Sequence, residues 1–182
     1  FTFFRDHELA MGSFATKTIP NKFLEFDPKG KIRIRFSLMP EELRQRLEPN
    51  TAPIINRIEA IDKFVEAGYD VDVNFSPVVV YAGWLEAYEE LFKLLDIYVE
   101  NKNEVNAEVI FLTHNKDKHQ YNVTNKLPGE SLLWQPDIQE DKVSQYGGTN
   151  IRYKSGLKYK YIQQFKALHK SIIPWNTIRY IF

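Results

Sequence analysis

The sequence lacks cysteine altogether, although it is 182 residues long. These residues can therefore form no disulfide and offer no thiolate ligand to a metal ion. The absence is typical of cytoplasmic proteins, where disulfides are rare, and we expect a cytoplasmic location. No apolar run approaches the length of about 20 residues that a membrane-spanning helix requires, so we expect no membrane partner.

Several familiar catalytic motifs are also missing. The sequence has no Gly-x-Gly-x-x-Gly motif, no phosphate-binding loop and no nucleophile elbow. His114 and His119 are five residues apart and have no supporting third ligand at a zinc-like spacing. The sequence therefore predicts no metal site formed by these residues.

Acidic residues are absent from the last part of the chain. Asp141 is the last of them, and residues 142–182 contain eight Lys or Arg residues. Residues 1–141 contain 16 basic and 24 acidic residues, so the formal net charge of the whole chain is zero. This segregation of charge favours a polyanionic partner for the C-terminal segment.

The apolar residues that are present indicate an α/β fold. A hydrophobic content of 43% and an aromatic content of 14% are typical of a folded globular domain. The expected strands are residues 12–16, 31–38, 71–75, 107–113 and 177–182, and the expected helices are residues 1–9, 40–47, 53–67, 84–99, 116–126 and 159–172. Residues 134–153 are expected to be irregular or to form a hairpin around Gly147 and Gly148. The alternation of strand and helix favours parallel strands with helices outside them.

Four polar residues lie at the carboxyl ends of expected strands: Lys17, Ser37, Ser76 and His114. In a parallel barrel these ends meet at one rim, where binding and catalysis take place. The alternative is that each polar residue ends its strand by meeting solvent. Pro77 cannot continue a central strand, so we expect the strand to stop at Ser76 and to leave backbone groups free for a ligand.

The segment 151–161, IRYKSGLKYKY, interleaves cations with tyrosines. The predicted nucleic-acid contacts are Arg152, Tyr153, Lys154, Lys158, Tyr159 and Lys160. Cations meet phosphates, and aromatic rings offer bases a surface for stacking. The alternative is a helix whose tyrosines pack inward while its lysines face water.

Four longer segments carry a family resemblance: SFATK, RIRFSLMP, RIEAIDKFVEAGYDVDVNFSPVVVYAGW and EVIFLTH. Together they resemble the spore photoproduct lyase family of radical SAM enzymes, and they look closest to the lyase-like branch outside spore formers. The resemblance implies the C-terminal part of a partial (β/α)6 barrel. It divides the chain into residues 1–133, the barrel half, and residues 134–182, a basic hairpin–helix–strand unit packed on the same domain.

The resemblance also implies cofactors and site residues. Family members bind S-adenosylmethionine and a [4Fe–4S] cluster held by three cysteines, and the spore enzymes repair a thymine lesion in DNA. Lys17 and Ser37 match residues that contact S-adenosylmethionine, and Ser76 matches a small residue beside it. The cluster loop is absent, so we expect a segment upstream of Phe1 and an inactive chain without it. The hairpin sequence EDKVSQYGGTNIRYK differs from that of the spore enzymes.

Three functions remain open at this point. The first is radical SAM repair or modification of DNA, which the resemblance favours. The second is a non-catalytic nucleic-acid-binding module that uses the basic C-terminal segment. The third is a radical SAM enzyme that acts on a substrate other than nucleic acid.

Overall fold

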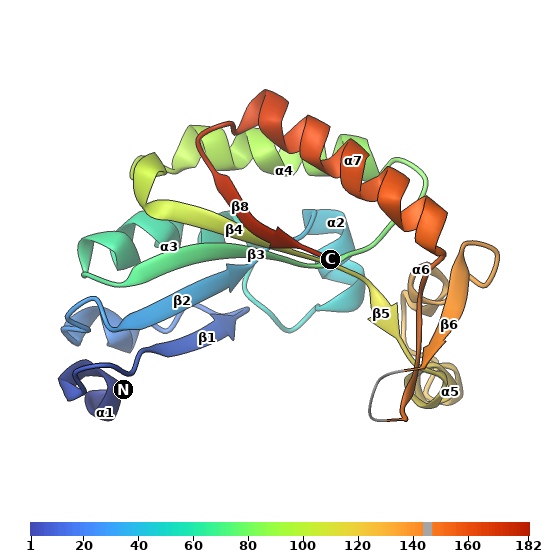
Figure 1. Ribbon diagram of the computed structural model, residues 1–182, viewed down its shortest axis with the longest axis horizontal. Coiled ribbons are helices and arrows are strands. Elements are labelled where there is room, and N and C mark those ends of the chain that lie inside the picture. Colours follow the sequence, from blue (N-terminus) through green and yellow to red (C-terminus); the bar gives the residue numbers. More distant parts are fainter. Residues whose placement is uncertain (144–146) are drawn as a thin grey trace.

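The computed structural model describes residues 1–143 and 147–182, and they form two sheets (Figure 1). The main sheet has the order β1-β2-β3-β4-β8, and all four neighbouring pairs are parallel. Its strands are β1 (Gly12–Thr16), β2 (Ile32–Ser37), β3 (Asp70–Val78), β4 (Val105–Phe111) and β8 (Thr177–Ile181). The small sheet is antiparallel, with the order β5-β7-β6. Its strands are β5 (Thr113–His114), β6 (Gln139–Val143) and β7 (Thr149–Tyr153).

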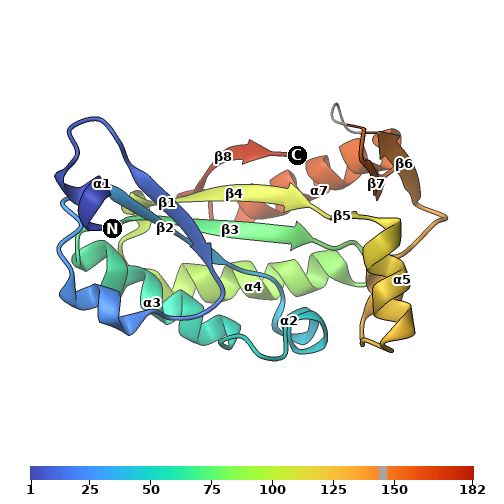
Figure 2. The same cartoon turned by 90° about the horizontal axis from the view of Figure 1, so that it is seen from below.

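The helices lie mainly on one side of the main sheet. The α-helices are α1 (Thr2–Asp6), α2 (Glu41–Leu47), α3 (Ile54–Glu66), α4 (Trp84–Tyr98), α5 (Lys116–Thr124), α6 (Glu130–Leu133) and α7 (Ser155–Ile172). Two 3-10 turns, η1 (Asn21–Glu25) and η2 (Lys102–Glu104), complete the described elements. Figures 1 and 2 show α3, α4 and α7 covering the same face of the sheet. Within the described residues, none of these helices combines the length and apolarity needed to cross a bilayer.

The apolar layer between sheet and helices follows from the sequence periodicities. Phe36 of β2 packs against Phe64 of α3, and Phe75 of β3 packs against Phe92 of α4 and Phe165 of α7. All five rings are fully buried. The alternating strands and the helical spacing of three or four residues direct these side chains into one core.

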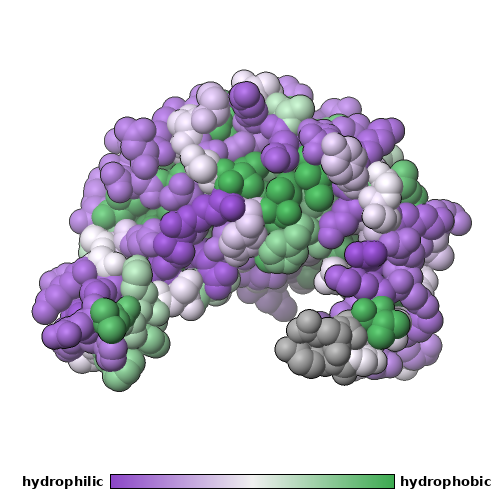
Figure 3. All heavy atoms as spheres, in the orientation of Figure 1, coloured by the Kyte–Doolittle hydropathy of each residue, from purple (hydrophilic) through white to green (hydrophobic). Residues whose placement is uncertain are grey.

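The opposite face of the main sheet, which we call the concave face, is charged. Asp72 is fully buried there and lies 2.9 Å from Arg179 and 3.5 Å from Arg33. On the same face, Arg35 of β2 lies 3.0 Å from Glu108 of β4. Burial raises the pKa of Asp72, and the two guanidinium groups oppose that rise. Figure 3 shows the molecule hollowed on this side, between its N-terminal end and the small sheet.

The predicted partial barrel is confirmed, because the sheet does not close on itself. Within the described residues β1 pairs only with β2, and β8 pairs only with β4, so both strands lie at edges. The predicted hairpin is formed by β6 and β7. Residues 144–146 of the predicted turn lie outside the described residues. After β7, helix α7 packs along α4, and β8 then joins the main sheet beside β4.

Candidate functional site

Two of the four predicted rim residues, Lys17 and Ser37, lie at the carboxyl end of the main sheet. Ser37 is the last residue of β2, and it pairs with Asn74 of β3. Lys17 follows the last residue of β1, whose partner is Phe36, and so lies beside Ser37. Parallel strands carry their polar ends to one edge, so this part of the sequence prediction is confirmed.

Two ionic residues, Glu48 and Arg57, contact Lys17 and Ser37. The Lys17 ammonium donates to Glu48 Oε1, and the other Glu48 oxygen lies 3.6 Å from Arg57 Nη2. Arg57 is fully buried and donates to the Ser37 carbonyl over 2.7 Å. The Lys17 ammonium therefore already has one anionic partner, and any incoming carboxylate shares it with Glu48.

Asn74 is a candidate that the sequence analysis missed. Its side chain is buried, and its Oδ1 has no hydrogen-bond donor among the described residues. A buried acceptor without a donor is rare, and it marks a place where a ligand can donate. The signal was present in the alternation of Asp70, Asp72 and Asn74, which puts all three side chains on the concave face.

This edge suits the S-adenosylmethionine that the family resemblance implies. That molecule carries a carboxylate for Lys17, polar groups for the Ser37 hydroxyl and N–H donors for the side-chain oxygen Oδ1 of Asn74. The residues present therefore fit the cofactor. They do not fit a [4Fe–4S] cluster, because this chain has no cysteine.

Ser76 lies in an irregular part of β3 rather than at its end. The pairing of β3 with β4 is regular up to Phe75 and resumes at Val78, and the Ser76–Pro77 peptide bond between them is cis. The expectation that the strand stops at Ser76 is therefore wrong. A bulge accommodates the proline instead, because an unpaired residue needs no N–H for the ladder.

His114 corrects the prediction of a common rim. It belongs to β5 and pairs with Ile151 of β7, so it lies in the small sheet and not at the end of the main one. The strand expected at residues 107–113 divides here, since β4 ends at Phe111 and β5 begins at Thr113. A sequence run of apolar residues does not reveal that the chain changes sheets within it.

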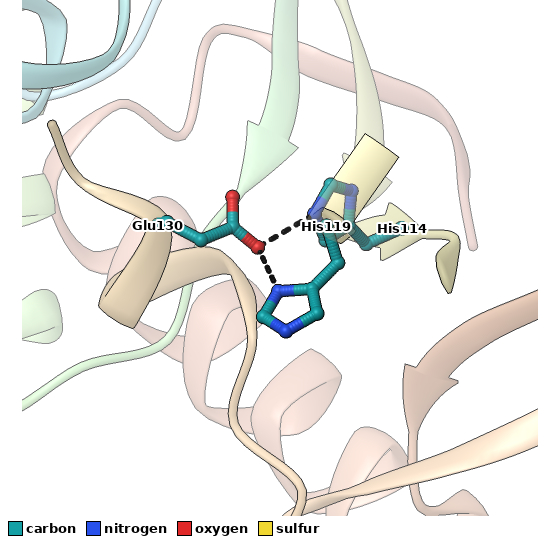
Figure 4. Close-up of side chains that lie close together, drawn as sticks. All are labelled: His114, His119 and Glu130. Carbon is teal, nitrogen blue, oxygen red and sulfur yellow. Dashed lines mark hydrogen bonds and ion pairs between the residues drawn. The ribbon is translucent and has the colours of Figure 1, made fainter. Parts of the chain in front are cut away.

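His114 instead faces His119 and Glu130 (Figure 4). Glu130 Oε1 lies 3.0 Å from His114 Nε2 and 2.6 Å from His119 Nδ1. Asn122 donates to Glu130 Oε2 over 2.5 Å. Burial raises the pKa of Glu130, but these three hydrogen bonds outweigh it and hold the pKa below its usual range. Glu130 is the third polar side chain that the spacing of the two histidines did not reveal.

The basic segment 151–161 divides between core and surface. Tyr153 has no exposed surface, and its hydroxyl accepts the Val80 N–H over 2.8 Å. The predicted stacking role of Tyr153 is therefore wrong, because its ring belongs to the core. The signal was the alternation of β7, in which Ile151 and Tyr153 point inward while Arg152 and Lys154 point outward.

The remaining predicted contacts are accessible to different degrees. Arg152 is half-buried and pairs with Glu140 across the hairpin, and Lys154 donates to the Asp137 carbonyl. Burial lowers the pKa of Lys158, with Arg152 and Lys142 adding to the effect. Lys160 is exposed.

Tyr159 is 68% exposed on the same helix. Its open ring contrasts with the buried ring of Tyr153. The inward-packing alternative therefore holds for Tyr153, while the stacking role of Tyr159 stays a prediction. Tyr159 and Lys160 are therefore accessible to a partner, and Lys158 lies half-buried between them and the rest of the segment in sequence.

Comparison with known proteins identifies relatives along the whole chain. A family model described as spore photoproduct lyase matches residues 1–182. The spore photoproduct lyase of Bacillus subtilis (strain 168) is 27% identical over 160 residues, which are 86% of this chain and 46% of that protein. The spore photoproduct lyase of Clostridium acetobutylicum is 26% identical over 149 residues, which are 80% of this chain and 43% of that protein. The chain thus spans about half the length of these relatives.

Solved structures share the fold. A spore photoproduct lyase complexed with dinucleoside spore photoproduct has a TM-score of 0.89 and 22% sequence identity, and the match covers 99% of this chain and 54% of that chain. A mutant of spore photoproduct lyase with bound AdoMet and dinucleoside spore photoproduct gives the same values. The architecture of the present sheet and helices is therefore that of these lyases.

Proposed function

Because the chain belongs to the spore photoproduct lyase family, we propose that it forms the cofactor-facing and substrate-facing part of a radical SAM enzyme that repairs or modifies DNA. The observation that carries this proposal is the group of polar side chains at the carboxyl edge of the main sheet, Lys17, Ser37 and Asn74. The cluster ligands would come from outside these residues, since the chain has no cysteine, and we expect the chain alone to be inactive.

Each side chain has a distinct task in this proposal. The Lys17 ammonium binds the methionine carboxylate of S-adenosylmethionine, and Glu48 orients the ammonium. The Ser37 hydroxyl and the side-chain oxygen Oδ1 of Asn74 bind polar groups of the same molecule, while the small side chain of Ser76 leaves room beside it. The cofactor supplies the radical chemistry, and the protein supplies its orientation and the exclusion of water.

A titration of S-adenosylmethionine tests the assignment. In the full-length protein with its cluster reconstituted, Lys17→Ala removes a charge-assisted bond worth about 1.5–3 kcal/mol, so the Kd should rise by about 10- to 150-fold. Asn74→Ala should also weaken binding. Lys22→Ala, an exposed lysine of η1, serves as the control. Equal Kd values for Lys17→Ala and Lys22→Ala would reject the site.

We also propose that three residues of the basic segment contact the DNA: the exposed Tyr159 and Lys160, and the half-buried Lys158 beside them. Residues 142–182 carry eight cations and no acidic residue, which supports a phosphate-binding surface. The internal partners of Arg152 and Lys154 reduce the contribution that these two residues make to such a surface. Tyr159 offers its open ring to a base.

Fluorescence anisotropy with labelled DNA separates the two contributions. Replacing Lys158 and Lys160 together by alanine should flatten the slope of log K against log salt by up to about 1.8 on duplex DNA. Tyr159→Ala should weaken single-strand binding by about 1–3 kcal/mol per base lost and leave the slope unchanged. Lys63→Ala, on the exposed side of α3, is the matched control.

The same measurements distinguish the other two functions. Cofactor binding without any DNA binding at low salt would favour a substrate other than nucleic acid. DNA binding without S-adenosylmethionine binding would favour a non-catalytic module.

A further inference from the structure

His114, His119 and Glu130 converge from three different elements. His114 lies in β5, His119 in α5 and Glu130 at the start of α6. One potential ligand atom from each residue lies within 4.8 Å of the others. Figure 4 shows both imidazole rings directed toward the same carboxylate oxygen. This cluster is separate from the carboxyl edge of the main sheet, and it is independent of the function proposed above.

The interatomic distances are close to those of a metal site. Glu130 Oε1 lies 3.0 Å from His114 Nε2 and 2.6 Å from His119 Nδ1. Ligands at about 2.0–2.1 Å from a tetrahedral Zn²⁺ ion lie about 3.4 Å from one another. The carboxylate oxygen therefore has to move away from each nitrogen by less than about 1 Å to admit the ion.

Neighbouring side chains hold the three groups in place. Asn122 donates to the second oxygen of Glu130 over 2.5 Å, which fixes the plane of the carboxylate. The His119 ring stacks on Trp134, with 3.8 Å between centroids and 13° between planes. Such outer contacts orient ligands in metal proteins and raise their affinity.

The burial of the cluster is suited to an ion that retains one solvent ligand. The side chains of His114 and Glu130 are 6% and 11% exposed, and that of His119 is 27% exposed. A shielded pair of ligands excludes competing water, and the more open His119 side leaves a path for the ion and a fourth position for water.

We propose that His114, His119 and Glu130 bind a divalent transition-metal ion, with Zn²⁺ as the preferred ion. Two imidazoles and one carboxylate form a ligand set that Zn²⁺ accepts in tetrahedral geometry. Coordination replaces the two N–H···O bonds to Glu130. Each neutral imidazole retains one proton, which moves to its other ring nitrogen, so binding requires no oxidant or reductant.

The ion would link the small sheet to helices α5 and α6. His114 pairs with Ile151 of β7, the residue before Arg152 in the basic segment. A bound ion would link β5 to α5 and α6, and so fix the strand from which that segment starts. Because the ion would bind the folded state alone, it would also stabilise that state.

Metal titration of tag-free, chelator-treated protein tests the site. Isothermal titration with ZnCl₂ should show one ion per chain with a Kd of about 1 µM or tighter. His119→Ala and Glu130→Gln should each weaken binding by about 100-fold or more. His7→Ala, an exposed histidine of the N-terminal region, should bind as the unmodified protein does. Mass spectrometry of the purified protein should detect bound zinc.

A cobalt titration uses the unmodified protein alone, so its result does not depend on whether the variants fold. Co²⁺ added to the unmodified protein should give the intense visible absorption of a four-coordinate ion, and Zn²⁺ should abolish it. Zn²⁺ should also raise the melting temperature of the unmodified protein and leave that of Glu130→Gln unchanged. Absence of saturable Zn²⁺ binding, or equal binding by the unmodified protein, His119→Ala and Glu130→Gln, would overturn the proposal.

Discussion

Replacing Tyr153 by phenylalanine tests whether this residue belongs to the core or to a nucleic-acid surface. The Tyr153 hydroxyl accepts the backbone N–H of Val80 over 2.8 Å, and both residues are buried. Removing the hydroxyl leaves the Val80 N–H buried without its acceptor. A buried donor left unpaired costs about 1–3 kcal/mol of folding free energy.

The packing of the ring itself should be kept. Its centroid lies 6.3 Å from that of Phe111 and 5.6 Å from that of Tyr161, and phenylalanine retains both edge-to-face contacts. The loss should therefore come from the hydrogen bond alone. For a domain of this size each kcal/mol lowers the melting temperature by about 2–4 °C, so Tyr153→Phe should lower it by about 4–8 °C for a central cost of about 2 kcal/mol.

Urea unfolding provides the assay, with Tyr159→Phe as the control. Tyr159 is 68% exposed, and removing its hydroxyl should change stability by less than about 0.5 kcal/mol. The midpoint for Tyr153→Phe should fall while the slope of the transition stays constant, since the exposed area on unfolding does not change. If the two variants unfold at the same urea concentration, or if only Tyr159→Phe is destabilised, the assignment of Tyr153 to the core is refuted.

Two further predictions concern pH and backbone conformation. Burial lowers the pKa of His169 in the folded chain. Between about pH 6.5, the ordinary pKa of histidine, and this lower pKa, only the unfolded chain binds the proton. The free energy of unfolding therefore falls as pH drops through this window. His169→Gln should flatten that fall in urea midpoints, whereas His7→Gln should preserve it. Gly129 has a φ of 86°, and an added Cβ would lie 2.4 Å from Leu47 Cδ2. Gly129→Ala should therefore cost about 1–2 kcal/mol in thermal unfolding, while Gly156→Ala, within α7 and open to solvent, should stabilise the chain by up to about 1 kcal/mol; equal effects would contradict the strain argument.

The order of the main-sheet strands and helices could be predicted because its signals are local. The alternation in β2 and the helical spacing in α3 each lie within one element, so the sequence determines which face is apolar. The ends of β1 and β2 then follow, and with them the positions of Lys17 and Ser37. The structure agrees with the predicted bounds of β1, β2 and α3 to within one residue, whereas β3 continues to Val78 and α7 begins at Ser155, before its predicted start at residue 159.

The features that could not be predicted depend on contacts between separate elements. Glu130 meets His114 and His119 only because α6 and β5 approach each other through an irregular connection. The short helix α6 was not expected, since four residues contain too little periodicity to be recognised. The burial of Tyr153 also depends on β7 packing toward Val80, which lies 73 residues earlier.

The ion pairs of the concave face also influence which alignment of the parallel strands is stable. A shift of β3 along β2 by two residues keeps every side chain on its own face, so the alternation of apolar residues does not forbid it. In the observed alignment Arg33 is opposite Asp70 and Arg35 is opposite Asp72. A shift that brings Asp70 opposite Arg35 would move the carboxylates by about 7 Å along β2. It would also separate the buried carboxylate of Glu108 from Arg35, its partner at 3.0 Å, at a cost of about 3–5 kcal/mol. The ion pair between Arg35 and Glu108 thus disfavours a misalignment that hydrophobic packing alone would tolerate.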